Sequence, residues 1–208
     1  MSIKTKIDSF LDQGNVDKDK KNAFTNAVLA SHATFVNDLI GNYGEVFSLV
    51  DPLLSYDQGE IADGIKCNIA DAKKFDYQCT FLHEKSFDVS GILDALKSTI
   101  SILYKEETEQ QVTDKDIGSM LGTLDSVLKS MLPSDSESNQ ERVSSSIIKL
   151  GDVEYEIVIG FIFDNMEDAG WFKHDKYNFF ESIVAIYTVA QRTELKKQSH
   201  KSKETSTV

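Results

Sequence analysis

The stretch from Val143 to Phe163 constrains the fold of this chain more than any other. It reads VSSSIIKLGDVEYEIVIGFIF, two runs rich in β-branched and aromatic residues that flank Gly151-Asp152. A two-residue loop with glycine first is typical of a type II′ turn, so the stretch predicts a β-hairpin. Alternate residues of the second run share one face: Val153, Tyr155, Ile157, Ile159, Phe161 and Phe163. Because that face is apolar throughout, another layer of the fold has to cover it.

The opposite face of this second strand changes character along its length. It begins with Glu154 and Glu156 and continues with Val158 and Ile162. A strand that is apolar on both faces lies in the interior of a sheet. We therefore expect a central strand whose two glutamates, at its polar end, are solvated.

Apolar residues recur at helical spacing in two regions near the N-terminus. The first region, residues 3–11, predicts a short amphipathic helix. The second region, residues 17–40, predicts a longer helix, with Gly41 at the position of a C-terminal cap. His32 lies on the apolar side of this helix, where a single histidine is usually a hydrogen-bonded core residue.

The stretch between residues 88 and 133 predicts an antiparallel helical hairpin. Its first helix ends in the acidic segment 106–111. Its second helix begins at Thr113, whose spacing to Asp116 resembles a capping box, and ends before Pro133. The apolar stripes of the two helices favour packing on a sheet, with a partner-binding groove as the alternative.

Further segments favour β-strands. Residues 45–50 suit a short strand, and the alternating segments 65–69 and 75–81, joined by a polar link, predict a second hairpin. The segment 179–190 is apolar at both parities and rich in β-branched residues. It suits a final buried strand, although its spacing also fits a helix.

The two cysteines, Cys67 and Cys79, lie at the same parity of the predicted second hairpin. A turn centred on Lys73 would place them opposite each other. Two readings follow: a pair of reduced thiols in the core, or a cross-strand disulfide in an exported protein. We find no further ligands at a suitable spacing for a metal, and we predict no metal or other cofactor.

Together these elements predict an α+β fold. We expect a single domain over residues 1–191, in which helices and a helical hairpin pack on a mostly antiparallel β-sheet. Residues 192–208 hold five basic and two acidic residues, a net charge of +3 in a chain whose formal net charge is −12. Their Ser, Thr, Lys and Gln content predicts a basic, disordered tail.

Charge and hydropathy exclude several classes of protein. A net charge of −12 argues against a nucleic-acid partner, because binding phosphates requires clustered Lys and Arg. The N-terminal sequence lacks the apolar core of a signal peptide, and no stretch is apolar enough for a membrane-spanning helix. We therefore expect a protein made in soluble form, which is either cytoplasmic or exported by a leaderless route.

Catalytic signatures are absent from the sequence. There is no nucleophile elbow, phosphate loop or dinucleotide fingerprint, so we predict that the chain is not an enzyme. The alternative is an unrecognised site around His174, Asp175 and the acidic loop from Asp164 to Asp168. That loop misses the EF-hand spacing because Met166 occupies the third position, which favours a solvated turn over a calcium site.

Three segments resemble a known family of pore-forming toxins. They read LASHATFVNDLI at 29–40, SFDVSGILDALKSTISIL through SVLKSML at 86–132, and YEIVIGFIFDNMEDAGWF at 155–172. Their order and pattern are similar to the layout of the cytolytic delta-endotoxin (Cyt-type) family. The resemblance implies one α/β domain in which helical hairpins flank a mixed sheet. It also implies that helices move off the sheet, which lets long amphipathic strands oligomerise or insert into a membrane.

Three functions from different classes follow from the sequence. The first is a non-enzymatic, membrane-active cytolysin that meets membrane lipid through the strand from Val153 to Phe163. The second is a self-assembling or protein-interaction protein in solution, in which the acidic body of one copy meets the basic tail of another. The third is an enzyme with the unrecognised site around His174.

Overall fold

The computed structural model describes residues 3–12, 17–50, 61–62, 64–83, 90–122, 140–166 and 177–205. Its centre is an antiparallel sheet with the strand order β4-β7-β6-β5. These strands are β4 (Lys74–His83), β5 (Gln140–Leu150), β6 (Val153–Met166) and β7 (Tyr177–Thr188). A small antiparallel sheet holds β1 (Phe47–Leu49), β3 (Ile65–Cys67) and β2 (Ile61–Ala62), in that order.

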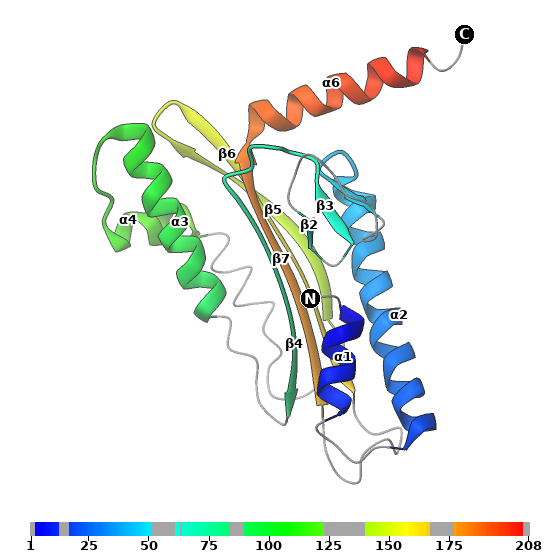
Figure 1. Ribbon diagram of the computed structural model, residues 1–208. Coiled ribbons are helices and arrows are strands. Elements are labelled where there is room, and N and C mark those ends of the chain that lie inside the picture. The colour runs from blue at the N-terminus through cyan, green and yellow to red at the C-terminus, as the bar shows by residue number, and fades with distance from the viewer. Residues whose placement is uncertain are drawn as a thin grey trace.

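Helices cover both faces of the four-stranded sheet (Figure 1). On one side lie α1 (Ile3–Leu11) and α2 (Lys18–Tyr43), and on the other lie α3 (Ser90–Thr108) and α4 (Asp114–Met120). A last helix, α6 (Val189–Thr205), follows β7 and runs away from the sheet. This arrangement confirms the predicted α+β fold with helices packed on an antiparallel sheet.

The β5–β6 hairpin forms as the sequence predicts. Leu150 pairs with Val153 across a loop of two residues, and the ladder continues to Gln140 and Phe163. Gly151 has a φ of 59°, whereas Asp152 is not left-handed, which is the pattern of a type II′ turn. Because β6 lies between β5 and β7, the expected interior strand is confirmed, and β7 confirms the final buried strand.

The two faces of the sheet belong to two separate hydrophobic clusters. The stripe from Tyr155 to Phe163 packs against α3 and α4, together with Phe180, Val184 and Ile186 of β7. The opposite face packs against α1 and α2 through Val158, Ile162, Phe179, Ile183, Ala185 and Tyr187. Both inner strands are therefore buried on both faces.

Helix α2 lies close to the sheet because a glycine leaves room for it. A Cβ atom at Gly160 would lie 3.0 Å from Cε2 of Phe35 and 3.1 Å from Cγ2 of Ile183. Phe35 itself is fully buried. The helix begins at its cap, Asp17, whose side chain accepts a hydrogen bond from the Lys20 amide at 2.9 Å.

The predicted helix boundaries hold at α1 and need a correction at α2. Helix α2 continues through Gly41, the predicted cap, to Tyr43, and Gly44 is the C-cap. The capping box at the start of α4 is confirmed, since the Thr113 side chain accepts from the Asp116 amide at 3.3 Å. The rest of the predicted second helix, from residue 123, lies outside the described residues.

The predicted hairpin between residues 65–69 and 75–81 is wrong. Strand β3 pairs with β1 and β2, whereas β4 pairs with β7 over ten residues, from Lys74 to His83. Alternating polarity identifies a strand but not its partner, and β7 offers the longer apolar ladder. Cys67 and Cys79 consequently lie in different sheets and are not joined by a disulfide.

The C-terminal segment also differs from the prediction. Residues 192–205, which we expected to be disordered, continue the helix α6. One local and one long-range interaction explain its start. Thr188 and Gln191 form a capping box, in which the Gln191 amide donates to Thr188 Oγ1 at 3.1 Å and the Thr188 amide donates to Gln191 Oε1 at 2.8 Å. Arg192 is held by two carboxylates, described below.

Several sequence predictions fall outside the described residues. These are the end of the acidic loop, at residues 167–168, and the candidate site residues His174 and Asp175. The start of that loop, from Asp164 to Met166, is instead the end of β6.

We predict that Gly160→Ala destabilises the protein by about 1–3 kcal/mol, because the added methyl group overpacks the contact between β6 and α2. Urea denaturation measures the change in the free energy of unfolding. Gly41→Ala is the matched control. It lies inside α2 with no atom within 4 Å of the new Cβ, and it should stabilise the helix by about 0.5–1 kcal/mol. Equal effects of the two changes would contradict close packing at Gly160.

Candidate functional site

Three buried or half-buried carboxylates lie on the sheet face that α1 and α2 cover, which we call the carboxylate face. Glu156 and Asp164 belong to β6, and Glu181 belongs to β7. The register places all three on one face, since Glu156 is opposite Tyr187 and Glu181 is opposite Ile162. Glu156 is 4% exposed and Glu181 is 0% exposed. Burial of a carboxylate costs several kcal/mol unless a partner compensates it.

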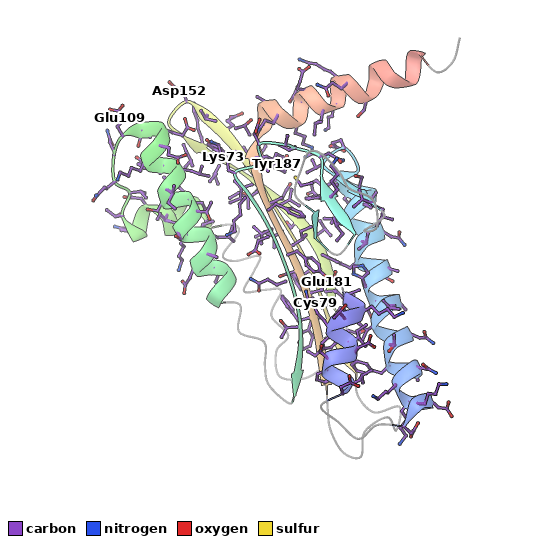
Figure 2. The ribbon with its side chains drawn as sticks, in the orientation of Figure 1. Lys73, Cys79, Glu109, Asp152, Glu181 and Tyr187 are labelled. Atoms are coloured by element: carbon purple, nitrogen blue, oxygen red, sulfur yellow. The ribbon has the colours of Figure 1, made fainter. Side chains whose placement is uncertain are left out.

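Adjacent residues of α2 bind two of these carboxylates. Nδ1 of His32 lies 2.7 Å from Oε1 of Glu181, a hydrogen bond between residues 149 positions apart (Glu181 is labelled in Figure 2). The hydroxyl group of Ser31 donates a hydrogen bond to Oδ2 of Asp164. The middle of α2 is thus fixed to both inner strands by polar contacts.

Arg192, from the first turns of α6, binds the third carboxylate. Its Nη1 donates to Oε1 of Glu156 at 2.5 Å. Its Nε and Nη2 both lie 2.6 Å from Oε1 of Glu45, which directly follows α2. The guanidinium group also lies over the Tyr43 ring, with Cζ 5.1 Å from the centroid. Arg192 therefore joins α6, the end of α2 and β6 in one cluster.

This cluster shifts the titration of its members. Burial alone would raise the pKa of Glu45, but a backbone hydrogen bond and the Arg192 guanidinium outweigh it and hold that pKa below its usual value. The two carboxylates raise the pKa of Arg192 despite its burial. Burial, together with the nearby charge of Glu156, raises the pKa of Tyr187. At neutral pH the cluster thus holds a charged Arg192 beside an ionised Glu45.

The other sheet face is attached to its helices differently. Among the described side chains of β6 and β7 on this face, those from Tyr155 to Phe163 and from Phe180 to Ile186 are apolar apart from Ser182 and the Tyr155 hydroxyl group. That hydroxyl donates to the Glu107 carboxylate of α3. Burial and the Glu107 carboxylate raise the pKa of Tyr155. We call this side the apolar face.

The residues chosen from the sequence have mixed outcomes. His32 is a hydrogen-bonded residue on the inner side of α2, as predicted. Glu154 is exposed, as predicted, but Glu156 is buried, so the expectation that both glutamates are solvated is wrong for Glu156. The reason is Arg192, which the sequence had assigned to a disordered tail.

The sequence analysis missed two residues of the site, Glu181 and Arg192, although the sequence held a signal for each. Glu181 is the one charged residue in the apolar run NFFESIVAIY, and a carboxylate at such a position demands a partner. The segment TVAQ at 188–191 fits the capping-box pattern and marks the start of a helix. Together they would have placed Arg192 in an ordered element.

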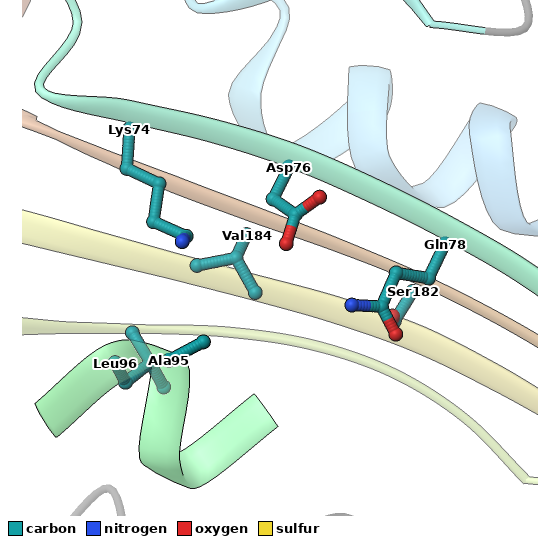
Figure 3. A pocket seen from close by; sticks show the side chains of 7 residues that line it. All are labelled: Lys74, Asp76, Gln78, Ala95, Leu96, Ser182 and Val184. Atoms are coloured by element: carbon teal, nitrogen blue, oxygen red, sulfur yellow. The ribbon is translucent and has the colours of Figure 1, made fainter. Parts of the chain in front are cut away.

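A small pocket lies between α3 and the sheet, with room for about one water molecule (Figure 3). Its lining is Lys74, Asp76, Gln78, Ala95, Leu96, Ser182 and Val184. No group of three or more His, Cys, Asp or Glu side chains among the described residues could hold a metal ion.

Comparisons with family models, with curated proteins and with solved structures found no match to this chain. None of the helices in the described part has the length and apolar content that crossing a membrane requires. The contrast between the two faces of the sheet is the observation that can support a proposal about function.

We predict that the cluster around Arg192 makes stability depend on acid pH through Glu45. Because the pKa of Glu45 is lowered in the folded state, its carboxylate stabilises the fold above its ordinary pKa of 4.5. That contribution is lost as the pH falls through the lowered, folded-state pKa. Glu45→Gln should therefore cost about 1–2 kcal/mol at pH 7 and much less at pH 3.

Urea denaturation at several pH values measures this difference. The control is Glu154→Gln, an exposed carboxylate on the same strand as Glu156. It should change stability little at either pH. A Glu45→Gln effect that does not depend on pH would contradict the assigned role of the carboxylate charge.

Proposed function

We propose that this protein is a non-enzymatic, membrane-active cytolysin, in which helices leave the sheet and expose strands that enter a lipid bilayer. The observation that carries the proposal is the contrast between the apolar face and the carboxylate face of β6 and β7. Membrane-spanning strands face lipid with an apolar surface and place polar residues on the opposite face. In β6 and β7 the first face is apolar almost throughout, and the second holds Glu156, Asp164 and Glu181 among apolar residues. The layout that resembles the cytolytic delta-endotoxin family supports the same reading.

Strand length is compatible with this role. A membrane-spanning strand needs about 9–11 residues. Strand β6 has 14 residues and β7 has 12, and they pair with each other along twelve positions. The tight turn at Gly151 adds β5 as a third strand of the same antiparallel unit.

Each face needs its helices for a different reason while the protein is in water. On the apolar face, α3 and α4 remove large side chains such as Phe161 and Phe180 from solvent. On the carboxylate face, α2 and α6 supply the partners of Glu181 and Glu156. Lipid could replace the first kind of cover, and water could replace the partners of the carboxylates. The apolar residues of the carboxylate face, such as Phe179 and Ile183, would need a further apolar surface. This is the physical route from the folded state to an inserted sheet.

We predict that a tether between α3 and the sheet abolishes membrane activity. Ala95 of α3 and Val184 of β7 line the same small pocket, so Ala95→Cys with Val184→Cys offers a site for a disulfide (Figure 3). The background carries Cys67→Ala and Cys79→Ala. Dye release from liposomes of neutral and of anionic lipids should fall at least tenfold in the oxidised protein, because α3 cannot leave.

The same protein after reduction is the matched control and should recover its release. The untethered background should release dye in proportion to its concentration. Absence of release from every lipid composition would overturn the proposal. Equal release by the oxidised and reduced forms would contradict departure of α3 as the required step.

A further inference from the structure

Helix α6 is an unusual element for a protein of this composition. Its start is fixed by the capping box and by Arg192, and Leu195 packs partly against the core. Residues 196–199 are exposed, and the helix extends away from both sheets (Figure 1). A helix that is polar on all sides gains little from packing on its own domain. Ion pairs of Lys197 with Glu194 and of Lys196 with Glu45 support α6, and its exposed side can meet another surface.

The charge of α6 indicates what kind of surface it fits. Residues 192–205 carry five basic and two acidic residues, whereas the rest of the chain carries a net −15. The body of the protein would therefore be repelled by a polyanion such as a nucleic acid or an anionic membrane. The same body offers a negative surface at the same concentration as α6 itself.

An exposed acidic cluster lies where α3 meets the β5–β6 turn. The two elements are in contact, since a Cβ atom at Gly151 would lie 3.2 Å from the Glu107 carbonyl oxygen. The cluster consists of Glu106, Glu109 and Asp152, all exposed. None of these three forms an ion pair with a described residue. Lys105, in the last turn of α3, offsets part of the charge.

The position of this cluster does not stabilise the isolated chain. Negative charges at the C-terminal end of a helix oppose the helix dipole and cost about 0.3–1 kcal/mol each. Glu106 and Glu109 lie at that end of α3. The chain's own α6 leaves the same end of the sheet in the direction away from Glu109 and Asp152 (Figures 1 and 2). A basic segment of another molecule would add to the compensation that Lys105 supplies.

We propose that two copies of this chain associate at this end of the sheet, with α6 of each copy docked on the acidic cluster of the other. Both surfaces lie at one end of the molecule and on opposite sides of it. A two-fold axis at that end therefore brings each α6 over the partner copy's cluster. The contact is isologous and closes at two copies. It does not depend on membrane activity.

Charge exchange between two variants tests this dimer. The first variant reverses the helix with Lys197→Glu, Lys201→Glu and Lys203→Glu. The second reverses the cluster with Glu106→Lys, Glu109→Lys and Asp152→Lys. Each variant alone opposes like charges, so its dimer should dissociate at a concentration at least tenfold higher than the wild-type dimer. Mixed in equal amounts, the two should form a heterodimer, because both contacts are then complementary.

Sedimentation velocity without lipid measures the oligomeric state. The wild-type dimer should dissociate at about 1 M salt, where the screening length falls to about 3 Å. The control is Lys4→Glu, Lys18→Glu and Lys115→Glu, three exposed lysines elsewhere, which should leave the dimer intact. Circular dichroism confirms that the variants remain folded.

Two outcomes would overturn the proposal. One is a wild-type protein that stays monomeric at low salt and high concentration. If anionic vesicles then bind wild-type protein but not the first variant, the partner of α6 is a lipid surface. The other is a dimer that persists in both variants, which would place the interface elsewhere. Dye release bears on neither outcome, so this test and that of the membrane proposal can fail separately.

Discussion

Carboxylates buried on one face of a sheet have to find partners, and in this protein those partners decide how the chain is assembled. Glu181 lies in the middle of β7 with no exposure, and its carboxylate is hydrogen-bonded to His32, which is far away in the sequence. Glu156 depends in the same way on Arg192. An uncompensated charge at either position would cost several kcal/mol, comparable with much of the stability of a domain. Helix α2 and the start of α6 are therefore confined to the carboxylate face.

The apolar face fixes the positions of its helices less strictly. Hydrophobic burial is proportional to the area removed from water and has no direction, so many helical arrangements satisfy it. On that face the hydroxyl group of Tyr155 and the Glu107 carboxylate add a directional contact, near the end of α3. Helices α3 and α4 are thus held mainly by non-directional contacts, which a lipid environment can replace. In the proposed membrane mechanism, α3 is therefore the layer that leaves the sheet.

This distinction also explains which parts of the structure could be predicted from the sequence. The β5–β6 hairpin was predictable because its turn and its alternation are local signals. The pairing of β4 with β7 was not, since alternating polarity does not name a partner. Helix α6 was wrongly predicted to be disordered because the prediction rested on its Lys and Ser content. The start of the helix depends on Glu45 and Glu156, which are distant in the sequence. Predicting the carboxylate face would have required both the local signals and the contacts between residues that are distant in the sequence.

The proposed dimer and the proposed membrane activity meet at α3. The acidic cluster joins the last turn of α3 to the β5–β6 turn, so a partner helix docked across it would bind both elements together. Departure of α3 from the apolar face would then break the dimer contact as well as the contact between Tyr155 and Glu107. By linkage, any condition that favours the dimer would oppose exposure of the sheet. If both proposals hold, the dimer is the form that keeps the sheet covered, and the monomer is the form from which α3 is free to leave.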